Sequence, residues 1–244
     1  MDASLAAAAV LSGLAMGGLS GTVADLVATP RYGVDAECHD PEDTELAPLD
    51  PPTTILQRVG LAVLGGAGMV ALAAALEDGW RLVYFGSLLF VYLAAMTVDL
   101  QYLRLPNVFT YPAAALAVVG ALALAAHEDV ATYGIWVGMA AYAGFLWFAR
   151  VAYMVSRGQE GMGLGDVKLA LSLGASVGWL GSVGFDPGWA GALRLVVYAA
   201  MAGLLLGAVI GLAVLRRVRV EIPFGPSLVL GWLLVVACFE PLTA

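Results

Sequence analysis

Long apolar runs recur along the whole sequence and constrain the fold more than any other feature. Each is about 18 residues or longer, enough to cross a hydrocarbon layer of about 30 Å as an α-helix. The composition agrees, because 61% of the residues are hydrophobic, 12% are charged and the mean hydropathy is +0.88. We therefore predict an all-α, polytopic membrane protein. Its transmembrane helices, about eight in number, are expected near residues 5–27, 57–76, 81–98, 109–126, 131–149, 167–185, 192–215 and 224–242.

The basic residues predict the orientation of these helices. Lys and Arg near the ends of membrane spans collect on the cytoplasmic side. With the N-terminus outside, all of the 11 basic residues except Arg81 and Arg194 fall on that side. We therefore expect an N-out and C-out arrangement. The first run starts with Asp2 and no Lys or Arg, so we interpret it as a retained anchor and not as a cleaved signal peptide.

One polar segment, residues 31–52, contributes much of the net charge of −8. Its acids, prolines and scarce apolar residues are typical of a solvated connector. It contains Cys38 and His39, but a structural zinc site needs four ligands and nothing nearby supplies the others. The second cysteine, Cys238, lies in the last apolar run. We therefore expect no metal site and no disulfide framework.

Glycines spaced four residues apart occur in two of the apolar runs. Small residues at this spacing let membrane helices pack closely, because lipid provides no hydrophobic drive for association. We assign to packing Gly13, Gly17 and Gly21 in the first run, and Gly203, Gly207 and Gly211 in the seventh.

Two acids differ from the others, most of which lie in loops. Asp99 ends the third run and Asp166 opens the sixth, so the predicted topology places both at the cytoplasmic face. An acid in a membrane helix is costly and points to function. Two carboxylates in a partly dry site share a proton, so that one activates water while the other protonates a scissile carbonyl. Taken singly, Asp166 could be a helix N-cap and Asp99 a helix-end acid.

The residues around the two acids predict how the backbone behaves there. Gly163 and Gly165 precede Asp166 and allow another backbone to come near. Pro106 pushes the residue before it out of helical geometry. Asn107 is then predicted as the N-cap of the fourth span.

Three motifs together resemble those of the type IV prepilin peptidases, which are intramembrane aspartyl proteases of the GxGD class. They are R-L-P-N at residues 104–107, G-x-G-D-x-K-L at residues 163–169 and I-P-F-G-P at residues 222–226. The resemblance covers roughly residues 80–240, in the order and spacing of the three motifs.

The resemblance implies roles for individual residues. Asp99 and Asp166 are the implied catalytic pair, and Gly163 and Gly165 are the glycines of the motif. Lys168 is either a topological anchor or a contact to an acid of the substrate or a lipid phosphate. The remaining implied positions, which flank the motif or the approach of the substrate, are Glu160, Pro106 and Asn107.

The same resemblance implies the activity. Members of the family remove short basic leaders from pilin-like precursors at the cytoplasmic face of the cell membrane, without a metal or organic cofactor. The expected partners are pilin-like precursors and membrane lipid, with no nucleic acid, and the oligomeric state stays open. We expect residues 80–244 to form the peptidase domain and residues 1–79 to form N-terminal spans with the acidic loop.

The N-terminal third departs from the family and leaves two alternatives. Many bacterial members carry two CxxC pairs there and methylate the new N-terminus with S-adenosylmethionine. This sequence has no CxxC pair, which puts a bifunctional peptidase and N-methyltransferase in doubt. The second alternative is a non-catalytic scaffold or an ion-coupled transporter, although a transporter is expected to bury its ionisable groups near the middle of the membrane.

Overall fold

The chain is almost entirely helical in the part that the computed structural model describes. That part comprises residues 3–27, 53–76, 78–102, 105–158, 163–185, 188–215 and 224–239. Within it there are eight helices and no strand, so the predicted all-α fold is confirmed. The helices are α1 (Ala3–Val27), α2 (Ile55–Ala75), α3 (Gly79–Tyr102), α4 (Asn107–His127), α5 (Tyr133–Arg157), α6 (Leu164–Gly184), α7 (Gly188–Leu215) and α8 (Phe224–Ala237).

Seven of the described helices, α1 to α7, are long and apolar enough to cross a membrane, and the chain is a multi-pass membrane protein. The eighth helix, α8, is apolar but has only 14 residues. At 1.5 Å per residue it is about 21 Å long, shorter than the hydrocarbon layer of about 30 Å. Within the span predicted over residues 224–242, the structure thus describes only this helix, because residues 240–242 lie outside the described part of the chain. The predicted orientation stays a prediction. Residues 31–52, Arg104, Glu160 and residues 216–223 lie outside the described residues.

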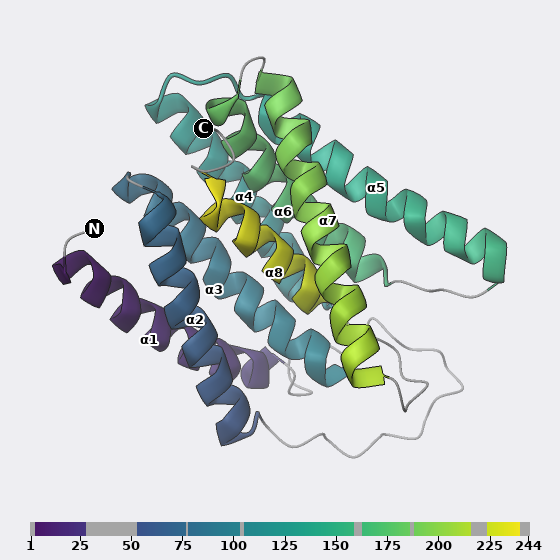
Figure 1. Cartoon of the computed structure of the whole chain (residues 1–244), viewed down its shortest axis with the longest axis horizontal. Helices are drawn as coiled ribbons and strands as arrows, with labels where there is room; N and C mark the ends of the chain where they lie inside the picture. The colour runs from purple at the N-terminus through teal and green to yellow at the C-terminus, as the bar shows by residue number, and fades with distance from the viewer. Residues whose placement is uncertain are drawn as a thin grey trace.

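Two helices form the centre of the bundle. In α3 and α6, 72% and 67% of the residues in the most apolar stretch are buried, against 28% in α1 and α5. The helix α6 packs against α4, α5, α7 and α8, and α3 packs against α1, α2, α4 and α8. Figure 1 shows α1 and α2 on one side of the bundle and α5 on the other. The two acids of interest thus belong to the two most enclosed helices.

Glycines bring neighbouring helices into backbone contact. A Cβ atom on Gly13 would lie 2.4 Å from the carbonyl oxygen of Gly65, and one on Gly17 would lie 2.1 Å from that of Leu61. The predicted packing role of these two glycines is confirmed at the α1–α2 contact. A Cβ atom on Gly203 would lie 3.2 Å from the carbonyl oxygen of Ser227 in α8, and one on Gly207 would lie 3.0 Å from the Ser227 hydroxyl oxygen. Gly21 makes ordinary contacts, and the surroundings of Gly211 lie outside the described residues.

The backbones of α5 and α6 also approach each other closely at glycines that the sequence analysis did not identify. This contact leads to a prediction about stability. A Cβ on Gly138 would lie 2.1 Å from the carbonyl oxygen of Gly174. Because the obstacle is backbone, Gly138→Ala should lower the free energy of unfolding by about 1–3 kcal/mol, measured by thermal unfolding in detergent. Gly144→Ala on the same helix is the matched control, since nothing described lies within 4 Å of its Cβ position. Equal melting temperatures for the two variants would contradict this packing.

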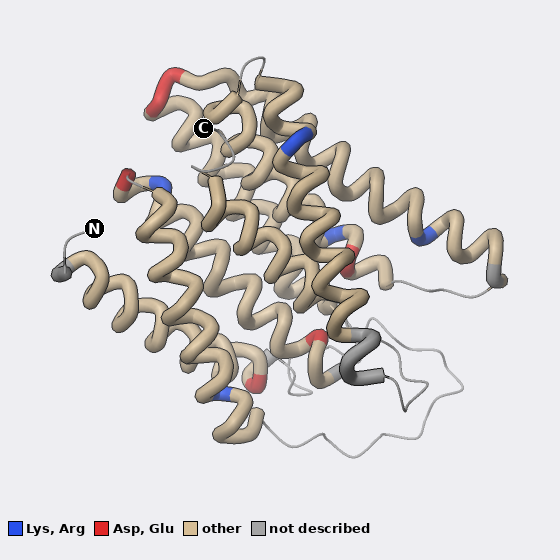
Figure 2. The backbone as a smooth tube through the Cα atoms, viewed as in Figure 1, with Lys and Arg blue, Asp and Glu red and all other residues tan. Residues whose placement is uncertain are grey.

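Most of the described Lys, Arg, Asp and Glu residues lie towards the two ends of the bundle (Figure 2). At one end, Asp25 of α1 accepts hydrogen bonds from Arg58 Nη2 at 2.6 Å and from the Thr53 backbone N–H at 2.8 Å. These bonds join the two sides of the segment 28–52. At the other end, Arg81 of α3 pairs with Glu128 beyond α4 at 2.6 Å.

Candidate functional site

Asp99 lies near the end of α3 and is almost fully enclosed. Only 4% of the residue is exposed. Its Oδ2 accepts a hydrogen bond of 2.9 Å from the backbone N–H of Gly225, the second residue of α8. The first N–H groups of a helix have no partner within the helix, and the helix dipole favours an anion there. The carboxyl group of Asp99 therefore ties the end of α3 to the start of α8.

Asp166 is the third residue of α6 and is 7% exposed. The N-cap of α6 is Gly163, whose backbone is extended with φ −66° and ψ 149°. The alternative that Asp166 itself is the N-cap is therefore wrong. Its carboxyl group instead receives a hydrogen bond from the backbone of Gly163. A carboxyl group at this position, one turn into a helix, typically reaches back to the N-cap N–H in this way.

Leu105, in the short connection between α3 and α4, brings the two acids to one end of the bundle. A Cβ on Gly165 would lie 2.7 Å from Leu105 Cβ and 2.8 Å from its carbonyl oxygen. A Cβ on Gly225 would lie 3.4 Å from Leu105 Cδ1 and 2.7 Å from Asp99 Oδ2. Leu105 thus contacts the glycine beside Asp166 and the glycine that binds Asp99. The charges of the two acids are close enough to interact.

The prediction that Asn107 is the N-cap of α4 is wrong. The helix begins at Asn107, its N-cap is Pro106, and no side chain caps it. Pro106 has an extended backbone, with φ −71° and ψ 150°, which suits an N-cap position. The side-chain oxygen of Asn107 instead accepts a hydrogen bond from Lys168 Nζ of α6. The same ammonium group lies over the ring of Tyr111, 5.1 Å from its centroid.

Three residues of this site were not identified as such from the sequence. Gly225 belongs to the I-P-F-G-P motif, so a signal was present in the sequence, although no residue of that motif was predicted as a site residue. Leu105 was noted only as the residue before Pro106, and Tyr111 carried no signal. The contacts of Leu105 and Tyr111 join segments far apart in the sequence, and the sequence pattern does not encode them.

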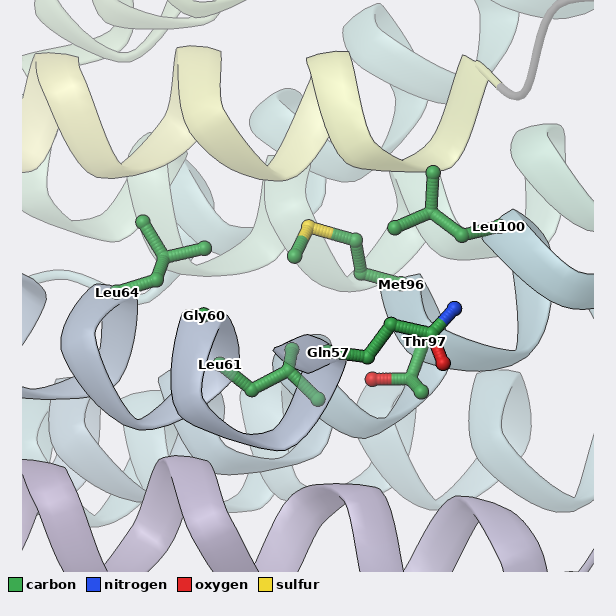
Figure 3. Close-up of a pocket in the computed structure, with 7 residues that line it drawn as sticks. All are labelled: Gln57, Gly60, Leu61, Leu64, Met96, Thr97 and Leu100. Carbon is green, nitrogen blue, oxygen red and sulfur yellow. The ribbon is translucent and has the colours of Figure 1, made fainter. Parts of the chain in front are cut away.

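An apolar cavity is lined in part by Leu100, the residue after Asp99, but by neither acid (Figure 3). Its volume is about 190 Å³, and it lies between α2 and α3. Thr97 lines it, but the Thr97 hydroxyl donates to the carbonyl of Leu93 in its own helix. The cavity therefore offers almost only apolar surface. Its lining residues are Gln57, Gly60, Leu61, Leu64, Met96, Thr97 and Leu100.

The donor set at the site is two carboxyl groups. In the part of the chain that the structure describes, no three His, Cys, Asp or Glu side chains lie close enough to hold a metal ion. An arrangement of two enclosed acids, each fixed by a backbone N–H, is suited to proton transfer to and from a bound water and carbonyl group.

Comparison with known proteins places these features in a family. Residues 86–215 match the type IV leader peptidase family. The chain is 33% identical over 169 residues to a prepilin leader peptidase/N-methyltransferase of Aeromonas hydrophila, covering 67% of this chain and 52% of the relative. Proteins of the same name match from Pseudomonas aeruginosa, at 31% identity over 68% of this chain and 56% of the relative, and from Burkholderia pseudomallei, at 34% over 73% and 54%.

Those alignments leave part of each relative unmatched. The chain spans about half the length of the curated relatives it matches. No solved structure is significantly similar to it. The motif resemblance seen in the sequence is confirmed by the family match.

Proposed function

Since this chain belongs to the type IV leader peptidase family, we propose that it is an aspartic-type endopeptidase. It removes short basic leaders from pilin-like precursors, and Asp99 and Asp166 are its catalytic residues. The observation that supports this proposal is that Asp99 of α3 and Asp166 of α6 are both buried, and that the glycine beside Asp166 and the glycine that binds Asp99 both approach Leu105. We assign the activity to residues 80–244, which include the matched residues 86–215.

The reaction needs one carboxylate and one carboxylic acid. The carboxylate takes a proton from a water molecule, whose oxygen attacks the scissile carbonyl carbon. The carboxylic acid gives its proton to the carbonyl oxygen, so that the tetrahedral intermediate carries no net charge. The C–N bond then breaks, the leaving nitrogen takes up a proton, and the pair again holds one proton. No metal or organic cofactor enters these steps.

The enclosed position of the site supports a membrane-embedded substrate. Both acids lie at one end of the bundle, which suits a junction between a polar leader and an apolar helix. We propose that the precursor's apolar helix lies in the bilayer beside the spans, in the inner membrane of the cell, with the cut on the cytoplasmic side. The names of the relatives, which mention prepilin leaders, support this substrate class.

The alternatives are less well supported. An ion-coupled transporter is expected to place its ionisable groups near the middle of the membrane in broken helices, whereas Asp99 and Asp166 lie near helix ends. The names of the relatives also include N-methyltransferase, but the chain matches only about half of each relative. We therefore propose the peptidase activity alone.

Co-expression with a pilin-like precursor tests the function. The chain should convert the precursor to a shorter product, detected by immunoblotting, and mass spectrometry should find a new N-terminus without an added methyl group. A precursor that stays full length beside well-expressed chain would contradict the peptidase. A methylated product would replace the proposal with the bifunctional enzyme.

A further inference from the structure

We propose that Lys168 is a positioning residue, which clamps the start of α6 to the start of α4 and so sets the position of Asp166 relative to Asp99. This inference rests on the proposed function, because it assigns to Lys168 a part in keeping the two acids aligned. It differs from both roles that the sequence had suggested, a topological anchor and a contact to an external anion.

The contacts of Lys168 form the clamp. Its ammonium group donates a hydrogen bond to the side-chain oxygen of Asn107 and lies 5.1 Å from the centroid of the Tyr111 ring. Asn107 and Tyr111 are four residues apart in α4, so they lie on one face of that helix. The side chain of Lys168 is half-buried. An ammonium group held by an amide oxygen and an aromatic face is directed at a neighbouring helix and not at the bulk solvent.

The clamp acts on the residues beside both acids. Lys168 is two residues after Asp166, and Asn107 is two residues after Leu105. Leu105 itself touches Gly165 and lies 3.4 Å from the Cβ position of Gly225, whose N–H binds Asp99. The Lys168–Asn107 bond therefore fixes the Leu105 connection against α6 and α8 together.

Small movements at such a place have large effects on catalysis. A displacement of about 1 Å in a catalytic group can cost about 10²-fold in rate. Without the clamp, the start of α4 can move away from α6, and Leu105 moves with it. We expect this movement to separate the two acids while the helices stay packed elsewhere.

Kinetics of the Asn107 variants test the clamp. Asn107→Leu removes the acceptor at nearly constant size and should lower kcat by about tenfold or more, with little change in KM. Asn107→Asp keeps an acceptor oxygen for the ammonium group and should retain most of the activity. Lys168→Met removes both contacts of the ammonium group and should lower kcat at least as much as Asn107→Leu. The double variant should lose less than the product of the two single losses, because the Lys168–Asn107 bond is removed by either substitution.

A matched control removes a similar contact elsewhere. Arg194 lies over the ring of Phe185, 5.4 Å from its centroid. That contact is at the other end of α6, about 28 Å from Asp166 at 1.5 Å per residue. Arg194→Met should therefore leave cleavage unchanged.

Chemical labelling tests the clamp without reference to activity. Lys168 is the only lysine in the sequence, so a water-soluble amine reagent reports on it directly once peptides are mapped by mass spectrometry. Arg194→Lys adds an exposed reference lysine to the same molecule. Lys168 should react several-fold more slowly than that reference, and adding Asn107→Leu should remove most of the difference.

The kinetic and labelling measurements together distinguish a failure of the clamp from a failure of the proposed function. If Lys168 contacts an external anion instead, Lys168→Met raises KM while Asn107→Leu leaves kcat unchanged, and the proposal is overturned. It is also overturned if Lys168 reacts as fast as the reference lysine. A wild-type chain that cleaves no precursor contradicts the proposed function, yet the labelling still decides whether the clamp forms.

Discussion

Asp99→Asn and Asp166→Asn should each slow precursor cleavage by a factor on the order of 10²–10⁴, with the protein still present in the membrane. Asparagine has the shape of aspartate but does not exchange a proton at neutral pH. In the Asp99 variant, the amide oxygen can still accept the hydrogen bond from Gly225 N–H, so the connection between α3 and α8 is kept. The initial rate of cleavage, normalised to the amount of membrane-inserted protein, measures the effect.

Asp129→Asn is the matched control for these two variants. Asp129 is exposed, lies between α4 and α5 at the end of α4 away from Asn107, and has a positive φ of 55°. Asparagine tolerates that backbone conformation, so the rate should stay near the wild-type value. A wild-type rate in either site variant would remove that acid from the mechanism.

Gly165→Ala should reduce cleavage by about 10²-fold or more, whereas Gly163→Ala should change it by a few-fold at most. The two glycines belong to one motif, yet their surroundings differ. At Gly165 the added Cβ would meet Leu105 Cβ at 2.7 Å and the Leu105 carbonyl oxygen at 2.8 Å. Backbone cannot give way cheaply, so the Leu105 connection has to move, and the positions of both acids move with it.

At Gly163 the nearest described atom to an added Cβ is Asp166 Oδ2, at 3.6 Å, which is an ordinary contact. Its φ of −66° and ψ of 149° are open to alanine. Measuring the initial rates of both variants beside the thermal stability of each separates a displaced site from an unfolded protein. Equal losses of rate in the two variants, or a larger loss for Gly163→Ala, would contradict the role given to Leu105.

The sequence predicted the helices well because length and apolarity dictate them. Seven of the predicted spans correspond to helices long enough to cross the membrane. For the eighth, the structure describes an apolar helix of 14 residues, Phe224–Ala237, and residues 240–242 of the predicted span lie outside the described residues. The small-residue spacing identified Gly13 and Gly17 as packing residues. It could not identify their partner on α2, because the choice of partner depends on the whole fold.

For the proposed site, the sequence singled out the two acids but not the residues that hold them in place. Asp99 and Asp166 stand out because acids are costly in membrane helices, and their position in the runs puts them at one end. Asn107 was misassigned because a capping preference is local, whereas its observed partner, Lys168, is 61 residues away. The contacts of Leu105 with Gly165 and Gly225 are likewise tertiary, and no local pattern specifies them.

The most direct test of the account is the cleavage rate of the double variant, Asp99→Asn with Asp166→Asn, beside the two single variants. If the two carboxyl groups share one proton and act as a unit, either substitution removes the whole function. The double variant should then be no slower than the slower single variant. If the double variant loses rate by the product of the two single losses, or if a single variant keeps the full rate, the two acids do not work as a pair.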